Sequence, residues 1–226
     1  MDLRAGLAHW GVSVLRPLPG GHRNHVFLVE SAEGRFVAKT TRHSEAALRW
    51  LMPVLAVAAR CGLNPPVLCE GSDGRFAPGG VTLEPFMPGE PATWSDVLDL
   101  QPRLRRLHAA LSSVRARPGQ GIGTEVPRAH RVALARAYGR LPGPAFTVVH
   151  GDVTPSNVLR TADGLSLIDW DEARRDHPAF DTPIPWQSAS VLNLRLRREV
   201  ASGWQVEPHY ARTLARRIKA RPGPAE

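Results

Sequence analysis

Three polar residues in the second half of the chain have the types and the spacing that phosphoryl transfer requires. Asp152 and Asn157 stand five positions apart in the segment His-Gly-Asp-Val-Thr-Pro-Ser-Asn, and Asp169 follows in the apolar segment Leu-Ile-Asp-Trp. A carboxylate can take the proton of an attacking hydroxyl, while an amide oxygen and a second carboxylate can hold Mg²⁺ on phosphates. The spacing therefore predicts Asp152 as the catalytic base and Asn157 and Asp169 as ligands of Mg²⁺.

Lysine is rare in this chain and occurs at an informative place. The sequence has 29 lysines and arginines, of which only Lys39 and Lys219 are lysines. Lys39 ends the apolar segment Phe-Val-Ala-Lys, and a compact ammonium with rotatable donors contacts phosphates in a way that a planar guanidinium does not reproduce. We expect Lys39 to contact the phosphates of a nucleotide, the alternative being an exposed lysine at the end of a strand.

The elements that must position these residues begin with short strands, predicted over residues 12–15, 25–29 and 36–39. Gly20 and Gly21 lie between the first two strands, where glycine lets backbone N–H groups approach phosphates closely. A plain hairpin turn explains these two glycines equally well. A helix is expected from Ser44 to Gly62, with Pro53 kinking or breaking it.

The middle and the end of the chain contain two more strands and then mainly helices. Strands are expected over 66–69 and 81–86, and helices over 100–111, 128–141, 187–203 and 208–220. The segment from Glu84 to Gly89 connects the two halves, and there Glu84, Phe86 and Met87 are expected to contact a nucleotide base. His108 lies on an apolar helix face and is expected to be a core histidine.

Together these motifs resemble the aminoglycoside phosphotransferase family and its choline-kinase-like relatives, from about Leu15 to Asp181. Residues 20–24 are similar to a Gly-Gly-x-x-Asn nucleotide loop, residues 150–157 to a His-Gly-Asp-x-x-x-x-Asn loop, and residues 168–170 to an Ile-Asp-Trp segment. The helix that starts at Glu45 and the acidic pair Asp176 and Asp181 also have counterparts in that family.

The resemblance implies an α+β fold of the protein-kinase type with two lobes. A small β-rich N-lobe with one main helix would span 1–87 and bind the nucleotide, and a mostly helical C-lobe would span 88–226. ATP (or GTP) and Mg²⁺ are the implied cofactors. Asn24 would contact the nucleotide, and Glu45 would pair with Lys39, although an acid at a helix N-terminus is also favourable to the helix dipole.

Composition narrows the possible partners. The net charge of +8 and the pI near 10.8 are compatible with nucleic acid, but no recognition motif accompanies the scattered arginines, so we expect no nucleic-acid partner. No apolar run is long enough to span a bilayer, and two cysteines are too few for a disulfide framework. We therefore expect a cytoplasmic protein, either a monomer or a dimer, without a membrane partner.

The expected function is an ATP- and Mg²⁺-dependent transfer of the γ-phosphoryl group to a hydroxyl of a small molecule. An aminoglycoside-type antibiotic is the favoured acceptor, because several acids could line a pocket for a polycation: Asp171, Glu172, Asp176, Glu199 and Glu207. Arginines are interleaved with these acids, so choline, homoserine or a sugar remain alternatives. A non-catalytic nucleotide-binding module of the same fold is a further alternative.

Overall fold

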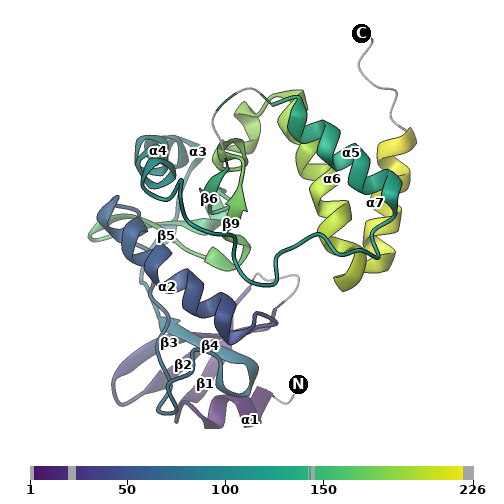
Figure 1. Ribbon diagram of the computed structural model, residues 1–226. Coiled ribbons are helices and arrows are strands. Elements are labelled where there is room, and N and C mark those ends of the chain that lie inside the picture. The colour runs from purple at the N-terminus through teal and green to yellow at the C-terminus, as the bar shows by residue number, and fades with distance from the viewer. Residues whose placement is uncertain (1–2, 20–23, 142, 144–145, 221–226) are drawn as a thin grey trace.

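The computed structural model describes residues 3–19, 24–141, 143 and 146–220 and has two parts (Figure 1). An antiparallel sheet in the order β1-β2-β3-β4 forms the N-terminal part, and helices with two small sheets form the C-terminal part. The strands are β1 (Ser13–Pro17), β2 (Val26–Ser31), β3 (Gly34–Thr40), β4 (Val81–Pro85), β5 (Glu90–Pro91), β6 (Thr147–Val149), β7 (Val158–Thr161), β8 (Gly164–Leu167) and β9 (Arg174–Asp176). The helices are α1 (Leu3–Ala8), α2 (Glu45–Arg60), α3 (Trp94–Asp99), α4 (Gln101–Ala110), α5 (Arg128–Gly139), α6 (Ala189–Val206) and α7 (Pro208–Ala220). This α+β architecture with a helical C-terminal part confirms the fold class expected from the sequence.

The register of the N-terminal sheet separates an apolar face from a polar one. Strand β3 pairs with β4 so that Lys39 lies opposite Thr82 and Val37 lies opposite Glu84. Side chains alternate along a strand, so the buried Ala38 faces α1 and its apolar cluster, whereas Lys39 and Glu84 share the opposite face. The sheet therefore presents both charged residues on the side away from α1.

Helix α2 starts where the sequence predicts and continues through its proline. The Ser44 side chain accepts a hydrogen bond from the Ala47 N–H, as an N-cap does. Pro53 lies inside the helix without ending it, so of the expected kink or break the break is wrong. Its missing N–H would have bonded the carbonyl of Arg49, a residue whose side chain is exposed.

One expected strand does not form. Residues 66–69 have no strand structure, and this segment joins the sheet only through the Cys69 N–H, which donates to the Leu83 carbonyl at 2.8 Å. Pro65 and Pro66 lack backbone N–H groups and cannot support a regular ladder there. The strands over 12–15, 25–29, 36–39 and 81–86 and the later helices are confirmed within a few residues at their ends.

The largest core cluster joins α2 to the C-terminal part. Leu51 and Leu55 of α2 pack with Leu104 and Leu107 of α4 and with Leu167 of β8. Figure 1 shows α2 lying between the sheet and the helices of the C-terminal part. A second cluster holds α5 and α6 together. Among the described residues, no helix has the length and apolar character to cross a membrane.

Replacing Leu107 by alanine tests this core. Leu107 is fully buried in the cluster shared by α2 and α4, so Leu107→Ala should lower the free energy of unfolding by about 2–5 kcal/mol. The matched control is Leu98→Ala on α3, where the side chain is exposed. Urea denaturation of both variants measures the difference, and equal losses would contradict this packing.

Candidate active site

The loop after β6 places the predicted base beside a predicted metal ligand. The amide nitrogen of Asn157 donates to Asp152 twice, to the carboxylate Oδ2 at 2.8 Å and to the backbone carbonyl at 2.9 Å. A 3₁₀ turn over Pro155–Asn157 makes this return possible, because it folds the five-residue spacing into one compact loop. The Asp152 carboxylate is therefore held in one orientation while the side chain stays partly exposed.

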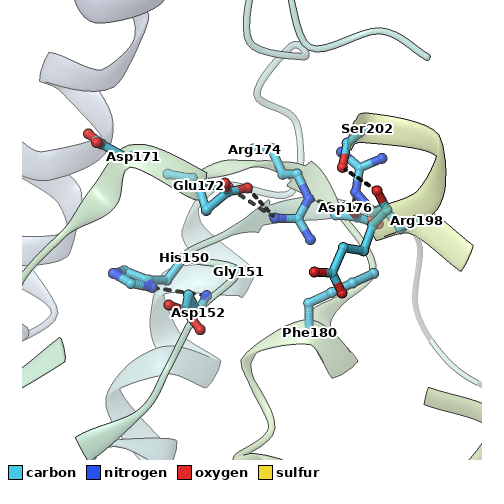
Figure 2. A network of polar contacts seen from close by, with 12 residues as sticks. His150, Gly151, Asp152, Asp171, Glu172, Arg174, Asp176, Phe180, Arg198 and Ser202 are labelled. Atoms are coloured by element: carbon cyan, nitrogen blue, oxygen red, sulfur yellow. Dashed lines mark hydrogen bonds and ion pairs between the residues drawn. The ribbon is translucent and has the colours of Figure 1, made fainter. Parts of the chain in front are cut away.

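His150 braces this loop from within (Figure 2). Its ring is fully buried and packs edge-on against Trp170, with ring centres 4.8 Å apart. Nδ1 accepts the Asp152 N–H at 3.2 Å, and Nε2 donates to the Ile168 carbonyl at 2.9 Å. Both ring nitrogens are occupied by backbone groups, so His150 fixes the loop and is not placed to shuttle protons.

The buried carboxylate of Asp181 anchors the same loop from the other side. Oδ2 accepts the His150 N–H at 3.0 Å and lies 2.8 Å from His108 Nε2, and Oδ1 accepts the Gly151 N–H at 2.8 Å. Burial alone would raise the pKa of Asp181, but the hydrogen bond and the positive charge of His108 and the Gly151 N–H outweigh it and lower that pKa. His108 is thus a satisfied core histidine, as expected.

Gly151 is required by both backbone and space. Its φ of +90° lies in the region that favours glycine. A Cβ at this position would also lie 2.3 Å from Nη1 of the buried Arg174. The loop can therefore make its sharp turn into Asp152 only with glycine here.

The β7–β8 hairpin brings the two predicted metal ligands to neighbouring positions. The Ile168 N–H donates to the Asn157 carbonyl at 2.9 Å, which places Asp169 directly after the residue opposite Asn157. Asp169 has a left-handed φ of +61°, which turns the chain out of the hairpin. Among the described residues, no group of three His, Cys, Asp or Glu side chains is arranged to hold a metal ion. An amide oxygen and one carboxylate nevertheless fit Mg²⁺, which usually takes its remaining ligands from water and phosphates.

The lysine pairing differs from the expectation. Lys39 Nζ lies 2.9 Å from Glu84 Oε1 and 3.4 Å from Asp169 Oδ1. Burial would lower the pKa of Lys39, but these carboxylates outweigh burial and raise it. The expected pair with Glu45 is wrong in this structure. Glu45 is the first residue of α2, and its carboxylate instead accepts the Phe76 N–H and pairs with Arg49.

The other predicted nucleotide contacts have partners within the protein where they are described. Met87 rests on β8, since its sulfur accepts the Ser166 hydroxyl at 3.2 Å. The Phe86 N–H is already used by the Arg35 carbonyl at 3.0 Å. Asn24 donates to Asp171 at 2.9 Å and so links the N-terminal part to the segment after Asp169. Gly20 and Gly21 lie outside the described residues.

One positioning residue gives no recognisable signal in the sequence. Arg117 lies in the loop before α5, yet its side chain is almost fully buried. Its Nη1 donates to the carbonyls of Asp171 at 2.8 Å and Ala173 at 3.1 Å, and its Nε to that of Ala47 at 3.3 Å. It thereby ties α2 to the segment that carries Asp169.

The acids expected to line a pocket for a polycation have other partners. Asp176 is buried and forms ion pairs with Arg174 and Arg198, whose Nε atoms lie 2.7 Å and 2.8 Å from its Oδ2 (Figure 2). Its Oδ1 accepts the Tyr138 hydroxyl at 2.7 Å. The Glu199 carboxylate accepts the Tyr210 hydroxyl at 2.6 Å. Glu172 lies 3.8 Å from Arg174, Asp171 accepts Asn24, and Glu207 also has a partner. Each of these acids therefore has a partner within the protein, and Asp176 is paired with two arginines.

Asp181→Asn should destabilise the protein in a pH-dependent way. An asparagine cannot accept from both backbone N–H groups, so we expect a loss of about 3–5 kcal/mol at pH 7. The pKa of Asp181 lies below its ordinary value of 3.8 in the folded protein. Its contribution is therefore fully present above that value and is lost as the pH falls through the lower folded pKa.

Unfolding free energies of both proteins, measured from pH 7 down to about pH 3, check this prediction. The gap between wild type and Asp181→Asn should narrow at the acidic end. A gap that stays constant or widens in acid would contradict the ionised state of Asp181.

Solved structures share this fold at low sequence identity. The choline kinase LicA from Streptococcus pneumoniae aligns with a TM-score of 0.58 at 13% identity and covers 96% of both chains. A putative fructosamine-3-kinase from Haemophilus somnus 129PT gives 0.59 at 13% identity, covering 96% of this chain and 95% of the other. The amicoumacin kinase hAmiN, solved with AMP-PNP, Ca²⁺ and Ami, gives 0.55 at 13% identity, covering 93% and 71%.

The family assignment comes from the sequence as a whole. No curated protein matches the chain. The profile of the phosphotransferase enzyme family, in contrast, matches residues 14–141 and 126–215, which together span most of the chain. That profile includes the loop of Asp152, the hairpin before Asp169 and the strand of Lys39, and it confirms both the expected resemblance and the expected enzyme class. The chain belongs to the phosphotransferase enzyme family.

Proposed function

We propose that this protein transfers the γ-phosphoryl group of ATP (or GTP), with Mg²⁺, to a hydroxyl of a small molecule. The observation that carries the proposal is the continuity of the site. Lys39 contacts Asp169, Asp169 follows the hairpin position opposite Asn157, and Asn157 holds Asp152. The residues that we propose as phosphate ligand, metal ligands and base therefore adjoin one another although they come from both parts of the chain.

Asp152 would act on the acceptor. Its Oδ2 is occupied by Asn157, whereas Oδ1 accepts no hydrogen bond from the described residues and is available to a hydroxyl. The acceptor proton would move to Oδ1 as the oxygen attacks the phosphorus. Because Asn157 fixes the carboxylate, the protein would orient the hydroxyl as well as deprotonate it.

The nucleotide and the metal would lie between the sheet and the hairpin. The amide oxygen of Asn157 and the carboxylate of Asp169 would hold Mg²⁺, which neutralises charge on the transferred phosphoryl group. Lys39 would contact the phosphates together with Gly20, Gly21 and Asn24. The Met87 N–H donates to no described acceptor, so it would be free for the nucleotide base. The presence of AMP-PNP and Ca²⁺ in the amicoumacin kinase structure supports a nucleotide and a divalent metal as ligands of this fold.

The charge of the site ranks the acceptor classes. A polycationic aminoglycoside would need free carboxylates, but the acids proposed for it already have partners, with Asp176 neutralised by two arginines. Choline, other amino alcohols, homoserine and sugars carry at most one positive amino group and need fewer carboxylates, so we place them ahead of aminoglycosides. The likeness in fold to a choline kinase and to a putative fructosamine-3-kinase supports the inclusion of small hydroxyl compounds in this set.

Asp152→Asn should abolish phosphoryl transfer with little effect on nucleotide binding. General base catalysis contributes about 10²–10⁴-fold to a rate, so kcat should fall by that factor. ADP release is measured with Mg-ATP across choline, amino alcohols, homoserine, sugars and aminoglycosides. The matched control is Asp163→Asn in the exposed turn of the β7–β8 hairpin. A variant at position 152 that keeps most of the acceptor-stimulated rate would refute the base assignment.

Asp169→Ala should instead weaken nucleotide binding that depends on Mg²⁺. Isothermal titration with ATP in the presence and absence of Mg²⁺ gives the two dissociation constants. In the wild type Mg²⁺ should tighten binding, and in Asp169→Ala this gain should shrink by about tenfold or more, because a carboxylate ligand is lost. An unchanged gain in the variant would show that Asp169 does not hold the metal.

A further inference from the structure

We propose that Glu84 on β4, and not Glu45 at the start of α2, is the carboxylate that positions Lys39 for the nucleotide. The inference rests on the proposed function, since it assigns the residue that holds the phosphate-contacting lysine in place. Glu84 is a positioning residue in this proposal, because it acts through Lys39.

The geometry of the sheet creates the pair. Lys39 lies opposite Thr82, and Glu84 lies two residues further along β4, on the same face. Diagonal neighbours on one face of a sheet are within reach of long side chains. Nζ of Lys39 is 2.9 Å from Oε1 of Glu84, and the two side chains are only 11% and 12% exposed.

Helix α2 was expected to supply a carboxylate to Lys39, but it covers the pair with apolar side chains instead. Leu48, Leu51 and Leu55 line a small cavity together with Thr82 and Glu84. These leucines are buried, and Asp171 and Trp170 also contribute to the lining beside the nearly buried Glu84 carboxylate. An ion pair in such surroundings is screened less than one at the surface. The attraction between Lys39 and Glu84 is therefore stronger than that of an exposed pair.

Glu45 is occupied elsewhere. Both of its carboxylate oxygens lie within 3.2 Å of the Phe76 N–H, and Arg49 one turn later on α2 lies 3.2 Å away. The contact with Phe76 fixes the segment before β4, and the negative charge of Glu45 interacts favourably with the N-terminal end of the α2 dipole. Glu45 thus serves the start of α2, and the sheet itself supplies the partner of Lys39.

This arrangement places both charged partners of the pair on the sheet. In protein kinases the lysine pairs with a helix glutamate, so a helix movement can break the pair. Here both partners lie on hydrogen-bonded neighbouring strands, and the helix packs into the core of the C-terminal part. The lysine would therefore be positioned before the nucleotide arrives.

Matched glutamine variants test the assignment by kinetics. Glu84→Gln should lower kcat/KM for ATP by about tenfold, because the glutamine can still accept from the Lys39 ammonium but no longer carries the negative charge that strengthens this contact. The loss should appear mainly in KM for ATP, with KM for the acceptor unchanged. Glu45→Gln keeps an acceptor for the Phe76 N–H and should change these constants by less than about threefold. The reverse ranking of the two variants would overturn the proposal.

The scarcity of lysine allows a second readout that needs no activity. With ¹³C- and ¹⁵N-labelled lysine the side chains of Lys39 and Lys219 give two sets of NMR signals, and Lys219→Arg assigns them. Glu84→Gln should shift the Lys39 signals, Glu45→Gln should leave them in place, and Lys219 serves as reference. Shifts caused by Glu45→Gln alone would overturn the proposal.

The two readouts separate this inference from the proposed function. If no acceptor supports turnover, the proposed function fails, while the NMR comparison still decides between Glu84 and Glu45. If Glu84→Gln does not fold, Glu84→Asp retains the charge on a shorter side chain. It should shift the Lys39 signals and raise KM for ATP, and unchanged values in that variant would count against Glu84.

Discussion

A carboxylate that is removed from water must be matched by donors, and Asp181 obtains them from α4 and from the loop after β6. His108 and the N–H groups of His150 and Gly151 all meet this one side chain. Because those backbone groups lead directly into Asp152, satisfying the buried charge also sets the course of the reactive loop. The brace by His150 and the contact between Asn157 and Asp152 then complete a geometry that Asp181 begins.

The arginines described above and Lys39 have different structural roles. Buried or partly buried arginines hold carbonyls and carboxylates in place, as Arg117 does for three carbonyls and as Arg174 and Arg198 do for Asp176. A guanidinium offers several donors in a fixed plane and suits such bracing. Lys39, a point charge on a flexible stem, is placed at the junction of the sheet and the hairpin.

Short-range features of the site could be predicted from the sequence, and long-range partners could not. Asp152 and Asn157 meet because they stand only five positions apart and a 3₁₀ turn folds the loop back, and Asp169 could be recognised as an acid within an apolar segment, whereas the hairpin that precedes it was not expected. The partner of Lys39 depends on how β3 and β4 align. The role of Arg117 depends on the path of a loop that is distant in the sequence from all three carbonyls to which Arg117 donates. Neither the alignment of two strands nor the path of a loop produces a local sequence pattern. The sequence therefore predicts Glu45 as the partner of Lys39, whereas the structure has Glu84.

Lys39 connects the N-terminal and C-terminal parts. It contacts Glu84 within its own sheet and Asp169, which follows the β7–β8 hairpin of the other part. Separation of the two parts would lengthen the contact with Asp169 and leave the contact with Glu84 intact. The ammonium would keep a counter-charge throughout, and the half-exposed Asp169 would be solvated by water. Separating the two parts therefore leaves no buried charge without a partner, which keeps the electrostatic cost of that separation low.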